Sequence, residues 1–236
     1  MPKLRVVTST YLLDIETALR LNRQLVEHVL DVTHHLFVEQ RDYAAFESRK
    51  TSFGQQFDLR VKPDGGGGGL GRSGSLCRSA MHAQILPLVG RDETVANIDS
   101  DTFFQNVGML ADVMCNPGET RGFTGLDYGE VAPLKLIDGT SFKSMSGMLI
   151  SAHAGVYTKA WKGVTQEVTR GICQLLMDSG HGCSEDVVAA YLYQVRGSAV
   201  AVSHETKYTR SIRGPALSRI YPSVEAGYPA DVDVIA

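Results

Sequence analysis

Two aspartates one residue apart follow a largely apolar segment, and they are the residues best suited to chemistry. Residues 95–98 predict a buried strand, and Asp99 and Asp101 come directly after it. On an extended chain, residues i and i+2 point the same way, so both carboxylates can face one ligand. Divalent cations prefer oxygen ligands and often keep phosphate oxygens in their shell. The pair could therefore hold a cation against a phosphate, although an isolated pair of this kind is more often a solvated acidic turn.

A second acidic pair, Glu185 and Asp186, lies at a predicted helix start. Ser184 is a suitable N-cap for an apolar helix over residues 187–195, and both carboxylates fall in its first turn. In that position they complement the helix dipole, which is one explanation for their presence.

The elements around the first pair predict a parallel sheet. Residues 4–9 and 34–38 read as strands, joined by a helix over residues 12–30 with Thr10 as its cap. Strand, helix and strand in about 40 residues form a βαβ unit, whose sheet binds ligands beyond the carboxyl ends of its strands. Residues 57–61 predict a third strand. His28, His34 and His35 are interpreted as structural, because adjacent strand residues face opposite ways.

Five consecutive glycines occupy residues 65–69, followed by more glycine up to Gly74 and a helix predicted over residues 76–89. Glycine loses much entropy on ordering, so this run is either a flexible surface loop or a loop at the mouth of a cleft. In the second case Arg72 or Arg78 would face a phosphate; in the first they are solvated. No Gly-Lys-Ser/Thr follows, so the run is not a Walker loop.

The second half of the chain predicts shorter elements. We expect a helix over residues 105–114, short strands over 123–142 with turns at Gly129 and Asp138–Gly139, and a strand and turn over 146–154. A single helix is predicted over residues 157–177, with Trp161 in the core. A buried strand over 199–202 ends just before His204.

Composition limits the classes of function. A chain of 236 residues that is 43% hydrophobic can form one domain with a substantial core. The net charge of −3 gives no global basic field for nucleic acid or an anionic membrane. The four cysteines have no CxxC spacing, and no apolar run is long enough to span a membrane. We expect a soluble, cytoplasmic protein with reduced thiols.

The order of these parts resembles the nucleotide-sugar-binding half of a GT-A glycosyltransferase. The segment from Gly71 to Ala80, followed by Asp99 and Asp101, is similar to the glycine–arginine helix and Asp-x-Asp strand of that family. Residues 146–157 resemble its acceptor-side strand and loop, and residues 184–187 resemble the helix start that supplies the catalytic base in many inverting members.

The resemblance covers most of residues 4–205 and implies a GT-A-like (Rossmann-like) α/β fold with a mostly parallel sheet flanked by helices. It implies a single domain with a nucleotide-sugar-binding half (residues 1–105), an acceptor and catalytic half (106–205) and a C-terminal tail (206–236). The implied enzyme moves a sugar from a nucleotide-sugar donor, expected to be a UDP-sugar, to a hydroxyl acceptor, with inversion.

The resemblance also implies roles for single residues. Asp99 would contact the ribose or the sugar, and Asp101 would bind Mn²⁺ or Mg²⁺, with Asp99 and His204 completing the ligand set. A mixed oxygen and imidazole set favours manganese. Asp186 is the candidate base, with Glu185 second, although both could serve the helix dipole alone.

The nucleoside and diphosphate contacts are expected at the ends of the first two strands and in the glycine-rich segment: Thr8, Thr10, Tyr11, Glu39, Arg72 and Arg78. Tyr11 could stack on the base or pack as a hydrophobic staple. The acceptor stays open among a glycan, a metabolite, a protein and a modified DNA base.

Two other functions stay open. A nucleotidyltransferase also uses metal held by aspartates. That class is expected to have a basic glycine-rich loop directly after the first strand, and residues 8–11 do not form such a loop. A catalytically silent sugar-nucleotide-binding protein is the other alternative.

Overall fold

The computed structural model describes residues 3–10, 15–29, 31–53, 57–64, 70–100, 102–104, 107–124, 133–145, 149–205 and 209–211. Of residues 70–72, 103, 107–109, 123–124, 203–205 and 209–211 it describes the backbone alone. The helices are α1 (Ile15–His28), α2 (Tyr43–Ser48), α3 (Leu70–Ile85), α4 (Val107–Val113), α5 (Ala154–Trp161), α6 (Gln166–Asp178) and α7 (Glu185–Tyr191). The strands are β1 (Lys3–Thr10), β2 (Val32–Val38), β3 (Phe57–Val61), β4 (Glu93–Ile98), β5 (Thr102–Phe104), β6 (Glu119–Thr124), β7 (Leu134–Lys135), β8 (Ser141–Phe142), β9 (Leu149–His153), β10 (Val200–Glu205) and β11 (Thr209–Ser211).

Seven strands form one sheet in the order β10-β6-β9-β4-β1-β2-β3. The neighbours β4, β1, β2 and β3 are parallel to one another, and β10 is parallel to β6. Only β9 runs against its neighbours, β4 and β6. The sheet is therefore mostly parallel, as predicted, and it runs without a break through strands from both halves of the chain.

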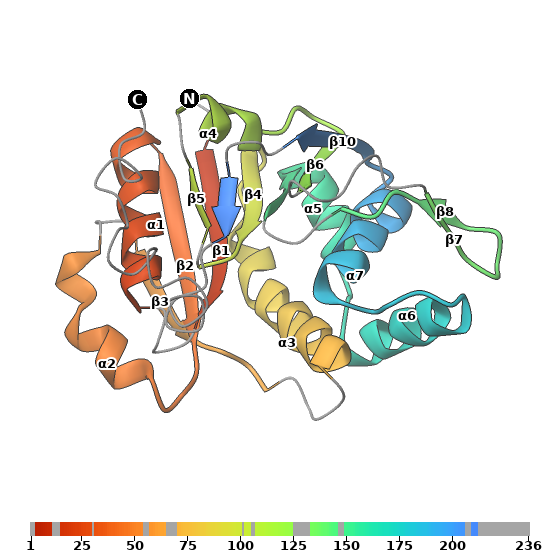
Figure 1. Ribbon diagram of the computed structural model, residues 1–236, viewed down its shortest axis with the longest axis horizontal. Helices are drawn as coiled ribbons and strands as arrows, with labels where there is room; N and C mark the ends of the chain where they lie inside the picture. Colours follow the sequence, from red (N-terminus) through yellow and green to blue (C-terminus); the bar gives the residue numbers. More distant parts are fainter. Residues whose placement is uncertain are drawn as a thin grey trace.

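Helices cover both faces of the sheet. Leu4 and Val6 of β1 pack on Leu21 and Leu25 of α1, whereas Val7 lies in the other large core cluster with Met81 of α3. This alternation follows from the two-residue period of a strand. Figure 1 shows the result: α1 and α2 lie to one side of the sheet, and α3, α6 and α7 lie to the other.

The first three strands and the Asp-x-Asp strand form where the sequence predicts them, but two local predictions are wrong. Thr10 is the last residue of β1 and is fully buried, so it does not cap α1, which begins at Ile15. Helix α3 begins at Leu70, six residues before the predicted start at Leu76, so the glycines at 71 and 74 lie inside it. The run at 65–69 lies outside the described residues.

In the second half, the helix predicted over residues 157–177 is two helices. Gly163 has φ of +69° and separates α5 from α6, because this left-handed conformation favours glycine and ends the first helix. Trp161, as predicted, is buried in the core. The hairpin β7–β8 turns at Asp138–Gly139, where Gly139 has φ of +86°. Helix α7 begins after Ser184, as predicted, and passes into a π-helical turn over Leu192–Arg196.

A row of polar side chains, buried except for Asp58 at its end, crosses four adjacent strands. Arg5 donates to Glu93 from Nε (2.8 Å) and Nη2 (3.1 Å), and its Nη1 lies 2.7 Å from His35 Nε2. His35 Nδ1 is 2.8 Å from Asp58 Oδ2. Burial lowers the pKa of His35 to about 4, so the ring is neutral, accepting from Arg5 and donating to Asp58.

The two adjacent histidines face opposite sides of the sheet. His34 contacts Asn22 and Thr8, each at 3.0 Å, on the α1 side, whereas His35 joins the row with Arg5. The structural role predicted for both residues is confirmed, since each ring is held by protein groups.

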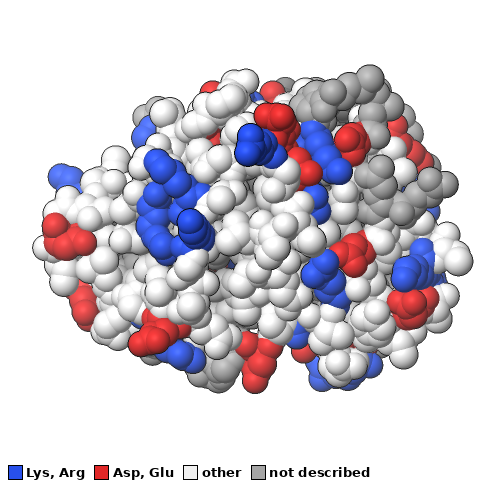
Figure 2. All heavy atoms as spheres, turned by 180° about the vertical axis from the view of Figure 1, so that it is seen from behind, with Lys and Arg blue, Asp and Glu red and all other residues white. Residues whose placement is uncertain are grey.

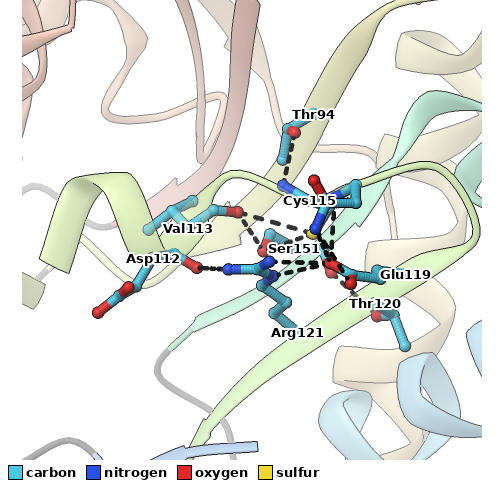
Figure 3. A network of polar contacts seen from close by, with 9 residues as sticks. Thr94, Asp112, Val113, Cys115, Glu119, Thr120, Arg121 and Ser151 are labelled. Atoms are coloured by element: carbon cyan, nitrogen blue, oxygen red, sulfur yellow. Dashed lines mark hydrogen bonds and ion pairs between the residues drawn. The ribbon is translucent and has the colours of Figure 1, made fainter. Parts of the chain in front are cut away.

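A second polar network joins β4 and β9 near the N-terminal end of β4. Ser151 Oγ donates to the Val113 carbonyl (2.7 Å), and the Cys115 amide donates to Thr94 Oγ1 (3.0 Å). Figure 3 shows these groups converging with Arg121 and Glu119. Burial raises the pKa of the Cys115 thiol to about 11, so it stays protonated and unreactive at neutral pH.

On the face seen in Figure 2, charged side chains lie in small groups, in several of which acidic and basic side chains are adjacent, and uncharged areas lie between the groups. On the far side of the core from α1, Lys159 and Lys162 are exposed, and Arg196 donates to the Lys162 carbonyl (3.0 Å). In the part of the chain that the structure describes, no helix is both long and apolar enough to cross a membrane.

Candidate active site at the carboxyl edge of the sheet

The carboxyl ends of the parallel strands meet at one edge. The register pairs Thr10 of β1 with Val38 of β2, and Val38 with Val61 of β3. Glu39 follows β2 directly, and Asp99 follows β4 directly. Ligands of open α/β sheets bind at this edge, so the sequence elements predicted to carry chemistry lie where such a ligand would bind.

Arg78 of α3 is the central group of this edge. Its side chain is 5% exposed, and it makes a two-point contact with Glu185 at the start of α7: Nε donates to Oε2 (2.8 Å) and Nη2 lies 2.7 Å from Oε1. Nη2 also lies 3.8 Å from Asp99 Oδ1. One guanidinium therefore joins a carboxylate of the first half to a carboxylate of the second half.

The carboxylates around Arg78 offset the electrostatic cost of burying its guanidinium. Burial alone would lower the pKa of this guanidinium, but Glu185, Asp99 and Asp186 together hold the pKa above its ordinary value. The alternative that Arg78 is a solvated cation is wrong. Its guanidinium already contacts carboxylates. The predicted contact with a diphosphate would therefore require these ion pairs to rearrange.

Asp186 differs from its neighbour Glu185. In the described part of the chain its carboxylate makes no hydrogen bond or ion pair, and the side chain is half-buried. Burial raises the pKa of Asp186 to about 6, against the attraction of Arg78 and with a further contribution from Glu185. A carboxylate that titrates near neutral pH can accept a proton under ordinary conditions.

Glu39 pairs with Lys62, a residue that no sequence motif singles out. Lys62 Nζ lies 3.3 Å from Glu39 Oε1, and the lysine side chain is 7% exposed. The adjoining Cys77 thiol donates to the Pro63 carbonyl (3.3 Å), and burial raises its pKa, so it is not a nucleophile at neutral pH. Lys62 directly follows β3, so its position after a predicted parallel strand could have placed it at the carboxyl edge.

Thr8 and Thr10, expected at the nucleoside, face the interior. Both are fully buried, and Thr8 Oγ1 lies 3.0 Å from His34 Nε2. Neither side chain has a surface that a ligand could touch in this structure. Tyr11 lies outside the described residues.

The predicted metal ligands are only partly described. Asp101 lies outside the described residues, as do the side chains of Arg72 and His204, whose backbones belong to α3 and β10. Among the side chains that are described, no group of three or more histidine, cysteine, aspartate or glutamate residues could hold a metal ion. The Asp99 carboxylate is 34% exposed and has Arg78 beside it, so a cation near Asp99 would have to share it with the guanidinium.

Comparison with known proteins identifies the fold. No family model matches the sequence, and no curated protein matches it. The structure is similar to 4-diphosphocytidyl-2C-methyl-D-erythritol synthase from Anaerococcus prevotii, with a TM-score of 0.53, 6% identity and coverage of 96% of this chain and 97% of that chain. It is also similar to residues 1–349 of S. aureus TarS, with a TM-score of 0.52, 13% identity and coverage of 88% and 59%.

The glycosyltransferase GlyE of Streptococcus pneumoniae matches with a TM-score of 0.49 and 12% identity over 87% of this chain. The chain spans 46% of the length of that structure. The predicted fold is confirmed: a mostly parallel seven-stranded sheet flanked by helices, as in the synthase and in TarS.

Proposed function

We propose that this chain is a metal-dependent glycosyltransferase that moves a sugar from a nucleotide-sugar donor, expected to be a UDP-sugar, to a hydroxyl acceptor. One observation carries the proposal: Arg78 brings Asp99, at the carboxyl end of β4, together with Glu185, at the start of α7. Donor-side and acceptor-side carboxylates thus meet at the edge where α/β sheets bind their ligands.

The residues have distinct roles in this proposal. Asp101 and His204 supply oxygen and nitrogen ligands to Mn²⁺, which when bound neutralises the charge that grows on the departing diphosphate. Asp99 contacts the ribose or the sugar, because Arg78 already lies beside its carboxylate. Asp186 takes the proton of the acceptor hydroxyl, since its carboxylate has no partner among the described residues and its pKa of about 6 lies near neutrality.

Donor binding tests the proposal directly. A panel of nucleoside diphosphates and their sugars, with and without Mn²⁺, should raise the melting temperature most for UDP or a UDP-sugar with metal. A ligand at a hundred times its Kd stabilises the native state by about 2.7 kcal/mol, which is about 5–10 °C for a chain of this size. No shift with any member of the panel would contradict nucleotide-sugar binding.

Asp101→Ala is expected to remove the manganese-dependent part of that binding. The affinity for UDP with Mn²⁺ should fall at least tenfold, because the ligand set loses a carboxylate, while weak metal-free binding persists. Asp92→Ala is the matched control: this aspartate is exposed in the turn before β4, at the other end of the same strand. Unchanged manganese-dependent UDP affinity in Asp101→Ala would refute the ligand role.

A nucleotidyltransferase is the second candidate. It is favoured by the similarity to the synthase, which covers 96% of this chain and 97% of that one and whose name specifies a diphosphocytidyl product. Release of pyrophosphate from a nucleoside triphosphate and a phosphorylated acceptor would support it over sugar transfer. Binding of UDP with manganese but no hydrolysis or transfer would instead indicate a silent binding protein.

A further inference from the structure

The start of α7 is fastened to α3 at more than one point. Besides the two-point contact between Arg78 and Glu185, Ser75 Oγ donates to the Cys183 carbonyl (2.8 Å), two residues before α7 begins. A Cβ placed on Gly74 would lie 3.6 Å from Glu185 Oε2, which shows how closely the two helices approach. Ser75 and Arg78, one turn apart on α3, therefore contact the loop before α7 and the first residue of α7, respectively.

Arg78 also reaches back to the sheet. Its Nη2, which contacts Glu185 Oε1 at 2.7 Å, lies 3.8 Å from Asp99 Oδ1. The two carboxylates are 86 residues apart in the sequence, and Arg78 contacts both of them. The guanidinium is rigid and planar, so the two-point contact through Nε and Nη2 fixes how Glu185 lies relative to Asp99, which is near the same Nη2.

The arrangement gives Glu185 and Asp186 different duties. Both oxygens of Glu185 are engaged by a buried arginine, and protonating this carboxylate would leave that charge uncompensated. Asp186, the next residue, has no such partner in the described part of the chain. Of the two acids, Asp186 alone is placed to exchange a proton.

We propose that Arg78 is a positioning residue: by holding Glu185 and Asp99 together it sets the place of the Asp186 carboxylate relative to the donor. Glu185 is then the anchor of α7 and takes no part in proton transfer. This inference rests on the proposed function for its kinetic consequences, but the coupling of α7 to α3 can be measured without any substrate.

Substitution of Arg78 separates positioning from direct donor contact. Arg78→Met should lower kcat for transfer about tenfold to a hundredfold and change the donor KM by less than about threefold, because the base is displaced while donor contacts persist. Arg78→Lys should recover only part of kcat, since an ammonium cannot make the two-point contact. A donor KM raised tenfold or more with kcat retained would overturn the proposal and place Arg78 on the diphosphate.

The pH profile supplies a readout that general loss of structure would not give. The groups that act on Asp186 are Arg78, which lowers its pKa, and Glu185, which raises it. The acid limb of kcat should therefore move to higher pH in Arg78→Met and to lower pH in Glu185→Gln. Shifts in the same direction, or none, would contradict the assignment.

Hydrogen exchange tests the positioning role independently of activity. The Val188 amide, which donates to the Ser184 carbonyl (3.0 Å) in the first turn of α7, should exchange at least tenfold faster in Arg78→Met than in the wild type. The matched control is Arg121→Met, which removes an arginine of similar burial (15% exposed) that pairs with Glu119 at 2.9 Å. It should leave α7 unchanged. Unaltered exchange in Arg78→Met overturns the proposal even if the chain transfers sugar, whereas faster exchange without any transferase activity counts against the proposed function alone.

Discussion

Asp186→Asn is expected to abolish sugar transfer and to make the protein more stable above about pH 6. A positioned general base contributes 10²–10⁴-fold to a rate, so turnover should fall about a thousandfold while donor binding is retained. The gain in stability has a separate cause. The wild-type carboxylate is ionised in a place that disfavours its charge, and an amide of the same shape carries no charge.

The sign of the stability effect follows from the pKa. Burial raises the pKa of Asp186 to about 6 from an ordinary 3.8, so the native state holds this proton more tightly than the unfolded state. Below about pH 4 both states are protonated and the effect vanishes. Between about pH 4 and 6 the unfolded state loses its proton first, and the wild type loses stability relative to Asp186→Asn.

The size of the effect can be bounded. A pKa of about 6 instead of 3.8 corresponds to about 3 kcal/mol, and water at this half-buried site reduces it to about 1–2 kcal/mol. Melting at pH 8 should therefore rise by about 3–6 °C, with less than about 1 °C difference at pH 4. Asp92→Asn, in an exposed turn, should change neither turnover nor melting. Near-normal turnover in Asp186→Asn would show that the base lies elsewhere.

The strands of the sheet were predictable because their signal is local. Residues 4–9, 34–38 and 57–61 are short segments of apolar or β-branched character bounded by turns, and each becomes a strand of the parallel half. The end of a parallel strand also predicts the edge at which its next residue lies. That rule placed Glu39 and Asp99 at one edge without any knowledge of their partners.

Helix boundaries were less predictable, because packing outweighs propensity there. The glycines at 71 and 74 indicate a loop, but they lie in α3, which packs against α6 and α7. In the other direction, the apolar spacing of 157–177 continues across Gly163, although the positive φ of that residue ends the helix. The spacing of apolar residues indicates which face of a helix is buried. It does not indicate a helix break after which the same face stays buried.

The pairing at the site could not be predicted. Arg78 and Glu185 are 107 residues apart, and nothing in either neighbourhood indicates that one would hold the other. Taken alone, each residue has a plausible separate role: Arg78 as a phosphate contact, and Glu185 as a dipole partner or base. Only the packing of α3 against α7 shows that the two charges satisfy one another.

The largest expected loss of stability comes from Arg5→Met. Arg5 and Glu93 are each 8% exposed in their side chains and meet at 2.8 Å, and His35 Nε2 is 2.7 Å from Nη1 of the same arginine. Removing the arginine leaves a buried carboxylate and a buried imidazole nitrogen without their main partner. Breaking one member of such a pair costs about 3–5 kcal/mol, which should appear as a lower urea midpoint with an unchanged m-value.

The paired variant distinguishes the cost of an orphaned charge from the loss of a useful contact. Arg5→Met with Glu93→Leu removes both charges, and a row made apolar at these two positions should recover at least half of the lost free energy of unfolding. Arg49→Met is the surface control, because its partner Glu16 is 73% exposed and pairs of this kind contribute about 0–1 kcal/mol. If the double variant were less stable than Arg5→Met alone, the ion pair itself, rather than the avoidance of an unpaired charge, would be what stabilises the sheet.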